Sequence, residues 1–154
     1  MVKLQKDLKE FIALMNSHGV DYVVVGGHAV GYHGYPRFTG DIDLFICPAP
    51  ENAARVMAVL RVFGFLELND VEKILLQPGK VVQLGRPPNR IDLLTGISGV
   101  DFDEASTGAQ ATLLDGIPVR IIGRTALLKN KRASGRAKDL ADVEELEKMS
   151  AAAD

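Results

Sequence analysis

Three aspartates in strand-like segments carry the clearest chemical signal of the chain. Asp41 and Asp43 stand one residue apart between apolar residues, and Asp92 lies in a second apolar run. Successive strand side chains face opposite ways, so Asp41 and Asp43 share one face while Ile42 and Leu44 face the core. If the two strands pair, three carboxylates converge, and divalent cations would offset their mutual repulsion. Oxygen ligands alone favour Mg²⁺ or Mn²⁺, and two such ions would suit the displacement of a phosphoryl group.

A glycine pair strengthens this interpretation because of its position. Gly26 and Gly27 follow the apolar stretch 22–25, and thirteen residues separate them from Asp41. Glycine lets the backbone approach a phosphate closely, and a helix that starts there supplies free N–H groups. Alone, the pair would be only a tight turn, and the Asp-x-Asp motif could be ordinary solvent-facing residues of an antiparallel strand. Taken with the later strand aspartate, the two motifs favour a site for metal and phosphate.

The composition is that of an ordinary globular protein. The chain has 154 residues, of which 47% are hydrophobic and 25% charged, and its single cysteine, Cys47, excludes an internal disulfide. The length predicts one domain over residues 1–149 with a frayed tail at 150–154. No apolar run approaches the length of a membrane span, and the first residues lack a secretory pattern. We therefore expect a cytoplasmic protein without a membrane partner.

Basic residues are concentrated in one part of the chain. The net charge is -2, yet the segment 116–138 holds seven basic residues and no acidic one. Such a tract suits a phosphate-bearing ligand, and a solvated helical face explains it equally well. The overall charge argues against long duplex nucleic acid as a partner.

Hydrophobic periodicity predicts an α+β protein, with one mixed sheet of about five or six strands and helices packed against it. Asn69 is expected to cap a short helix that runs to Leu76, and Thr125 to cap a helix that starts at Ala126. The other expected helices are 3–17, 28–32, 51–63 and 136–149. The expected strands are 21–26, 41–47, 80–84 and 90–95, followed by a hairpin of 112–114 with 117–122.

The motifs resemble the signature of the polymerase-β-type nucleotidyltransferase superfamily, which combines a small-residue turn, Asp-x-Asp and a third strand carboxylate. Two further segments, 90–102 and 127–142, resemble small bacterial and archaeal nucleotidyltransferase-like proteins, relatives of the type IV toxin–antitoxin toxins. The resemblance covers residues 20–147. It implies the nucleotidyltransferase fold, an NTP donor, a divalent metal, and transfer of NMP to an acceptor with release of pyrophosphate.

By this resemblance, Asp41, Asp43 and Asp92 match the metal-binding, catalytic carboxylates, with Asp92 helping to deprotonate the attacking hydroxyl. Gly26-Gly27 matches the turn that contacts the triphosphate. Many members have serine at the second of these positions, whereas Gly27 can offer only its backbone.

The resemblance also assigns nucleotide-binding residues in the C-terminal part. Lys129 matches a phosphate-binding lysine, and Lys138, Asp139 and Asp142 match a Lys-Asp-x-x-Asp motif. An ion-pair network between the last two helices explains these charges equally well. Arg37, just before the strand with the Asp-x-Asp motif, either reaches a phosphate or lies on a loop.

The function expected from these motifs is metal-dependent nucleotidyl transfer to a hydroxyl group. The acceptor is open between RNA, a protein and a small molecule. One alternative is a non-catalytic nucleotide-binding module of a toxin–antitoxin pair, with its partner protein encoded nearby. Another alternative is an antibiotic-modifying nucleotidyltransferase.

Overall fold

The computed structural model describes residues 6–35, 41–65, 68–86 and 90–153. The strands of its six-stranded sheet are β1 (Tyr22–Val25), β2 (Asp41–Ile46), β3 (Val81–Leu84), β4 (Arg90–Leu94), β5 (Gln110–Leu114) and β6 (Ile117–Ile121). The helices are α1 (Lys6–Ser17), α2 (Gly26–Tyr32), α3 (Pro50–Phe63), α4 (Val71–Leu75), α5 (Phe102–Thr107), α6 (Arg124–Ser134) and α7 (Ala137–Ala153). The α+β class and the mixed sheet are confirmed.

The strand order β3-β4-β2-β1-β6-β5 places β2 between β1 and β4. β2 runs antiparallel to β1 and parallel to β4. In this register Asp43 lies opposite Val25 on one side and opposite Asp92 on the other. The centre of the sheet therefore brings one aspartate next to another and next to the residue that precedes Gly26.

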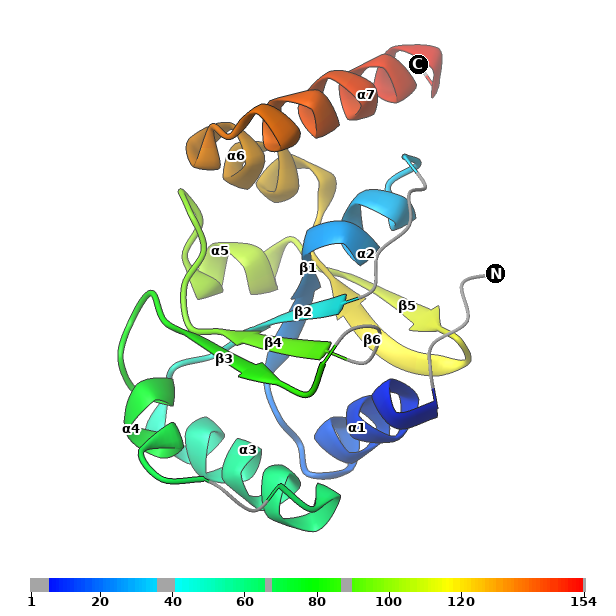
Figure 1. Ribbon diagram of the computed structural model, residues 1–154. Coiled ribbons are helices and arrows are strands. Elements are labelled where there is room, and N and C mark those ends of the chain that lie inside the picture. Colours follow the sequence, from blue (N-terminus) through cyan, green and yellow to red (C-terminus); the bar gives the residue numbers. More distant parts are fainter. Residues whose placement is uncertain (1–5, 36–40, 66–67, 87–89, 154) are drawn as a thin grey trace.

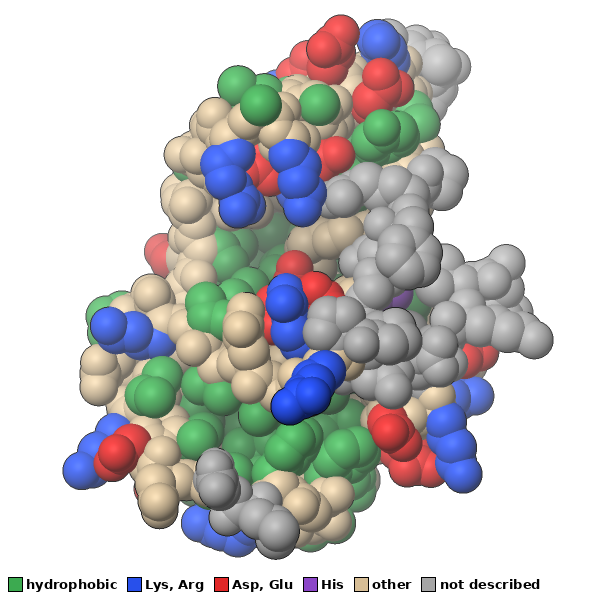
Figure 2. All heavy atoms as spheres, in the orientation of Figure 1, with side chains coloured by type: hydrophobic (Ala, Val, Ile, Leu, Met, Phe, Trp, Pro, Cys, Tyr) green, Lys and Arg blue, Asp and Glu red, His purple; other side chains and the backbone are tan. Residues whose placement is uncertain are grey.

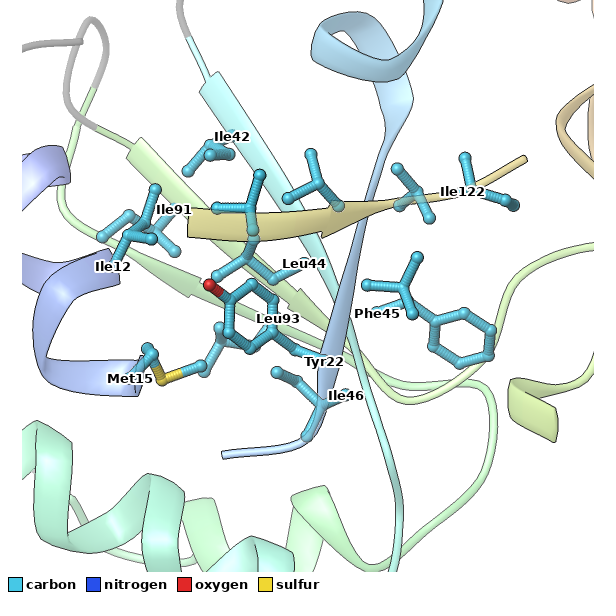
Figure 3. Close-up of a cluster of buried hydrophobic side chains, with 14 of the residues drawn as sticks. Ile12, Met15, Tyr22, Ile42, Leu44, Phe45, Ile46, Ile91, Leu93 and Ile122 are labelled. Atoms are coloured by element: carbon cyan, nitrogen blue, oxygen red, sulfur yellow. The ribbon is translucent and has the colours of Figure 1, made fainter. Parts of the chain in front are cut away.

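Helices cover both faces of the sheet (Figure 1). α1 and α3 lie on one side, α2 and α5 on the other, and α6 packs with α7 beyond them. The side chains of Ile42, Leu44 and Ile46 are fully buried on the α1 side, where Ile12 and Met15 also lie (Figure 3). These positions confirm the alternation of β2 read from the sequence.

The opposite face of β2 is covered further along the strand. Phe45, which follows Asp43 on that face, is buried and packs edge-on against Phe102 of α5, with ring centroids 5.2 Å apart. The carboxylates therefore lie at the edge of a covered surface rather than on a solvated one, and their burial has electrostatic consequences.

Helix α5 is absent from the elements predicted by periodicity, because one short turn gives little periodic signal. Its cap is nevertheless visible in the sequence: the Asp101 carboxylate accepts a hydrogen bond of 2.7 Å from the backbone N–H of Glu104. The last helix continues to Ala153, beyond the predicted end at Met149. No helix of the described part of the chain is long and apolar enough to cross a membrane.

Two predicted helix caps are wrong. Asp70, not Asn69, precedes α4, and it adopts a left-handed conformation with φ 65°, which aspartate tolerates better than most residues. α6 begins one residue before Thr125, after Gly123. A side chain at Gly123 would overlap the backbone carbonyl of Gly108, so only glycine fits at the residue that precedes this helix.

Candidate active site

The three predicted carboxylates come together on neighbouring strands. Asp43 of β2 and Asp92 of β4 are direct neighbours in the parallel pair, and Asp41 lies opposite Arg90 in the same pair. Asp92 is 8% exposed, and the other two aspartates are half-buried. The two strands therefore pair, which is the condition under which the sequence predicts that the carboxylates converge.

The surroundings of Asp43 disfavour its charged form. Burial raises the pKa of Asp43 to about 6, and the charges of Asp92 and Asp41 and a hydrogen bond with Asp92 act in the same direction. The Arg90 guanidinium partly opposes this increase in the pKa. Burial, reinforced by the neighbouring carboxylates, thus makes the charged form of Asp43 unfavourable in the folded protein.

Arg90 contacts two of the three carboxylates. Its Nη2 lies 2.7 Å from Asp41 Oδ2, and its Nε lies 3.1 Å from Asp92 Oδ1. The sequence motifs assign no role to Arg90, although strand alternation places it on the same face as Asp92, two residues later. The two-residue spacing between Arg90 and Asp92 could therefore have predicted that Arg90 lies close to the carboxylates.

The turn at Gly26 is built against Asp43. Gly26 begins α2 with φ 71°, a conformation that side-chain-bearing residues rarely adopt. A Cβ atom at this position would overlap the Asp43 carboxylate. Glycine is therefore required twice, for the backbone conformation and for the approach of the carboxylate.

Gly26→Ala is expected to disrupt the site more than the fold. The added methyl group pushes the Asp43 carboxylate away, and the left-handed conformation destabilises the protein by about 1–2 kcal/mol. Nucleotidyl transfer should fall by at least about tenfold, because displaced catalytic groups lose their alignment. Kinetics of transfer and urea unfolding measure the two effects.

Gly31→Ala is the matched control for this prediction. It changes a glycine of the same helix that has no neighbouring atom within 4 Å of the added methyl group. It should retain wild-type transfer and be as stable as the wild type or up to about 1 kcal/mol more stable, because alanine favours a helix over glycine. Equal activity of Gly26→Ala and Gly31→Ala would contradict the contact between the turn and Asp43.

A pocket of about 220 Å³ lies between the glycine turn and the two last helices. In Figure 2, basic side chains along the lower edge of α6 and α7 face a cluster of acidic and basic side chains over the sheet. The polar residues and glycines that line the pocket are Gly26, Gly27, Asp43, Ser98, Asn130, Lys131, Ser134, Arg136, Lys138 and Asp139. The pocket thus joins two carboxylates, a glycine turn and several cations.

The predicted nucleotide-binding residues do not all reach this pocket. Lys138 and Asp139 line it. Lys129 is instead half-exposed outside the pocket lining, where its Nζ donates hydrogen bonds of 2.9 and 3.0 Å to the Glu104 carboxylate. Asp142 is buried between the last helices, and Arg37 lies outside the described residues.

The buried cation of this region is Lys131. Its Nζ lies 3.1 Å from Asp139 Oδ1 and 3.2 Å from Asp142 Oδ2, and all three side chains are almost fully buried. Ser134 and Arg136 also donate hydrogen bonds to Asp139. An ion-pair network does join α6 to α7, with Lys131 as its centre. The two aspartates of the Lys-Asp-x-x-Asp motif therefore help to hold α7 against α6, beside the pocket.

The stability of the protein should depend on pH through Asp139. Burial alone would raise the pKa of Asp139, but hydrogen bonds from Ser134, Arg136 and Lys131 outweigh it and lower the pKa to about 2. A lowered folded-state pKa gives stability that is present above about pH 4 and is lost as the pH falls towards 2. The ionised Asp139 therefore contributes about 2 kcal/mol near neutral pH.

Urea unfolding of wild type and Asp139→Asn checks this expectation. The variant should be less stable near neutral pH, and the difference should shrink as the pH falls from about 4 to about 2. A difference that stays constant over this range would contradict the assigned network.

The donor atoms of the carboxylate cluster fit a hard divalent cation. Asp41, Asp43 and Asp92 offer only oxygen ligands, the type preferred by Mg²⁺ and Mn²⁺. Burial first, and then the charges of Asp92 and Asp41, raise the pKa of Asp43, and a bound cation would favour its charged form. Among the described residues, however, no three acidic, histidine or cysteine side chains are already arranged as a metal site. The all-oxygen donor set is thus what suits the cluster to a hard cation.

The sheet, the glycine turn and the paired aspartates define the nucleotidyltransferase fold. TM1012 from Thermotoga maritima, provisionally described as a nucleotidyltransferase, has a similar structure with a TM-score of 0.55 and 14% identity, over 93% of this chain and 88% of that one. ANT(2″)-Ia, solved with adenylyl-2″-tobramycin, has a TM-score of 0.53 and 17% identity, over 94% of this chain and 93% of that one. The lincosamide antibiotic adenylyltransferase LnuA, solved with lincomycin, has a TM-score of 0.51 and 17% identity, over 94% of this chain and 96% of that one.

The family is more specific than the fold. Residues 4–153 match the model of the family described as nucleotidyl transferase of unknown function (DUF2204), and the chain belongs to this family. No curated protein matches the sequence. The chain is thus a nucleotidyltransferase by family, and its acceptor is a separate question.

Proposed function

We propose that this chain is a metal-dependent nucleotidyltransferase that moves NMP from an NTP to a hydroxyl group. The observation that carries the proposal is the position of Asp43, which pairs with Asp92, lies directly against the Gly26 turn and lines a pocket with basic residues. Family membership supports the reaction class. The proposal adds Mg²⁺ or Mn²⁺, with two ions, as the cofactor.

Each group of the proposed site has a part in one balanced reaction. Asp41, Asp43 and Asp92 would hold the metal, which supplies positive charge beside the triphosphate. The acceptor oxygen forms a bond to the α-phosphorus while the bond from that phosphorus to the bridging oxygen of the β-phosphate breaks. Asp92 accepts the hydroxyl proton, and pyrophosphate leaves.

The pocket residues would hold the triphosphate. The backbone of Gly26 and Gly27 allows close approach of phosphate oxygens. Arg136 and Lys138 line the same pocket and would offset the charge that develops on the leaving pyrophosphate. Lys129 is paired with Glu104 outside the pocket lining, so we give its expected phosphate role to these two cations.

A small hydroxylated molecule is the first acceptor class to test. ANT(2″)-Ia was solved with an adenylylated tobramycin, and LnuA is described as a lincosamide antibiotic adenylyltransferase. These names support an antibiotic-modifying reaction as a second, narrower candidate for this chain. RNA and protein acceptors, and a partner protein encoded nearby, are the competing outcomes.

Transfer of label tests the proposal directly. The protein is incubated with each NTP labelled on the α-phosphate, with Mg²⁺ or Mn²⁺, and with separated RNA, protein and small-molecule fractions of a cell extract, tobramycin and lincomycin included. We expect one fraction to gain label from the α-phosphate but none from a γ-labelled NTP. Asp92→Asn should lose the transfer, whereas Asp103→Asn, on the exposed surface of α5, should retain it. Absence of label in every fraction, or full transfer by Asp92→Asn, would contradict the proposal.

A further inference from the structure

A basic side chain already occupies the carboxylate cluster. Arg90 of β4 is the direct neighbour of Asp41 of β2, so backbone pairing alone places its guanidinium beside the cluster. The guanidinium spans two carboxylates: Nη2 contacts Asp41 Oδ2 at 2.7 Å and Asp92 Oδ2 at 3.3 Å, and Nε lies 3.1 Å from Asp92 Oδ1. Arg90 therefore contacts both oxygens of Asp92.

These contacts place a positive charge directly beside the carboxylates that would hold a metal ion. A divalent ion held by Asp41 and Asp92 would lie next to the guanidinium, and two cations in that space would repel each other. The side chain of Arg90 is 30% exposed, which leaves the guanidinium a route towards solvent.

We propose that Arg90 is an internal counter-cation, which holds the carboxylate cluster together in the metal-free protein and is displaced when the metal binds. This inference rests on the proposed function, because it assigns the metal to the same carboxylates. In the metal-free state the guanidinium offsets part of the repulsion between the aspartates. On metal binding it gives up these contacts, so the protein binds metal more weakly than the carboxylates alone would.

Arg90 could either compete with the metal ion or position the carboxylates as metal ligands. If Arg90 competes with the metal, its removal should tighten metal binding while it destabilises the metal-free protein. If Arg90 only positions the carboxylates as metal ligands, its removal should weaken metal binding. The two roles therefore predict opposite changes in one measured affinity.

Calorimetric titration with Mn²⁺, without NTP, tests the inference on the wild type and on Arg90→Gln. We expect Arg90→Gln to bind Mn²⁺ about three- to tenfold more tightly, because the competing state is removed. Its thermal unfolding without metal should occur at a lower temperature than that of the wild type. Arg120→Gln is the matched control, since Arg120 is a similarly exposed strand arginine that pairs with Asp21 outside the cluster, and its Mn²⁺ affinity should equal that of the wild type.

The outcomes separate the inference from the proposed function. Equal or weaker Mn²⁺ binding by Arg90→Gln, with normal binding by the wild type, would overturn the role of Arg90 and leave the proposed metal site intact. Absence of Mn²⁺ binding by the wild type would overturn both. If Arg90→Gln does not fold, Arg90→Lys gives the same comparison, because a lysine cannot span two carboxylates as a guanidinium does. Tighter binding by Arg90→Lys supports displacement, and equal or weaker binding contradicts it.

Discussion

Asp43→Asn is expected to abolish nucleotidyl transfer and, at the same time, to stabilise the metal-free protein. Transfer should fall by at least about a hundredfold, because the variant removes a charged group from the centre of the proposed site. The free energy of unfolding near pH 8 should rise by about 2 kcal/mol. The reason is that burial, together with Asp92 and Asp41, raises the pKa of Asp43 to about 6, so its ionisation destabilises the folded state.

The stability difference should follow the titration of Asp43. A raised folded-state pKa means that the wild type loses stability as the pH rises from about 4 to about 6, and the neutral asparagine does not. The gain from Asp43→Asn should therefore be absent near pH 4 and complete above about pH 6. Urea unfolding of the metal-free proteins over this pH range measures it.

Asp21→Asn is the control for Asp43→Asn. It removes a carboxylate that pairs with Arg120 at 2.5 Å outside the site and is 45% exposed. Such a pair contributes at most about 1 kcal/mol, so this variant should be equally or slightly less stable and should transfer normally. A less stable Asp43→Asn near pH 8 would show that the cluster is not under electrostatic strain.

Lys131→Met is expected to destabilise the protein by about 3 kcal/mol. The substitution leaves Asp139 and Asp142 buried without the cation that joins them across α6 and α7. Because these helices line the proposed nucleotide pocket, the affinity for NTP should fall as well. Urea unfolding and a titration with NTP measure the two effects.

Lys129→Met, two residues away on the same helix, is the matched control for stability. Its ion pair with Glu104 is about half exposed and should contribute less than about 1 kcal/mol. Similar losses of stability in the two variants would contradict the assignment of Lys131 as the buried cation. The comparison also separates the structural lysine from the one that the sequence resemblance selects.

Much of the carboxylate cluster could be predicted from the sequence because strand alternation is a local property. Asp41 and Asp43 had to share one face once Ile42 and Leu44 were assigned to the core. The pairing of Asp43 with Asp92 could not be predicted in this way, because the order of strands in a sheet depends on packing between distant segments. The same limit applies to Gly123, because its close approach to Gly108 depends on the packing of two separate segments.

Lys131 and Arg90 were harder to predict from the sequence than the carboxylates. Lys131 lies one helical turn after Leu127 and Leu128, on the buried face of α6, and this spacing distinguishes it from Lys129. A lysine on an apolar face is uncommon, and the family resemblance selected Lys129 instead. Arg90 was visible as part of the motif around Asp92, but only the β2–β4 register shows which carboxylates it contacts.

The parallel pairing of β2 with β4 also bears on folding. A parallel pair needs a crossover connection, and here α3, α4 and β3 lie in the chain between the two strands. The contact of Asp43 with Asp92 closes a long loop of chain, which has an entropic cost before the contact forms. Asp43 gains its neighbour of like charge on that side only when β4 pairs with β2. The repulsion within the cluster is therefore a property of the paired sheet and is absent from the separate strands.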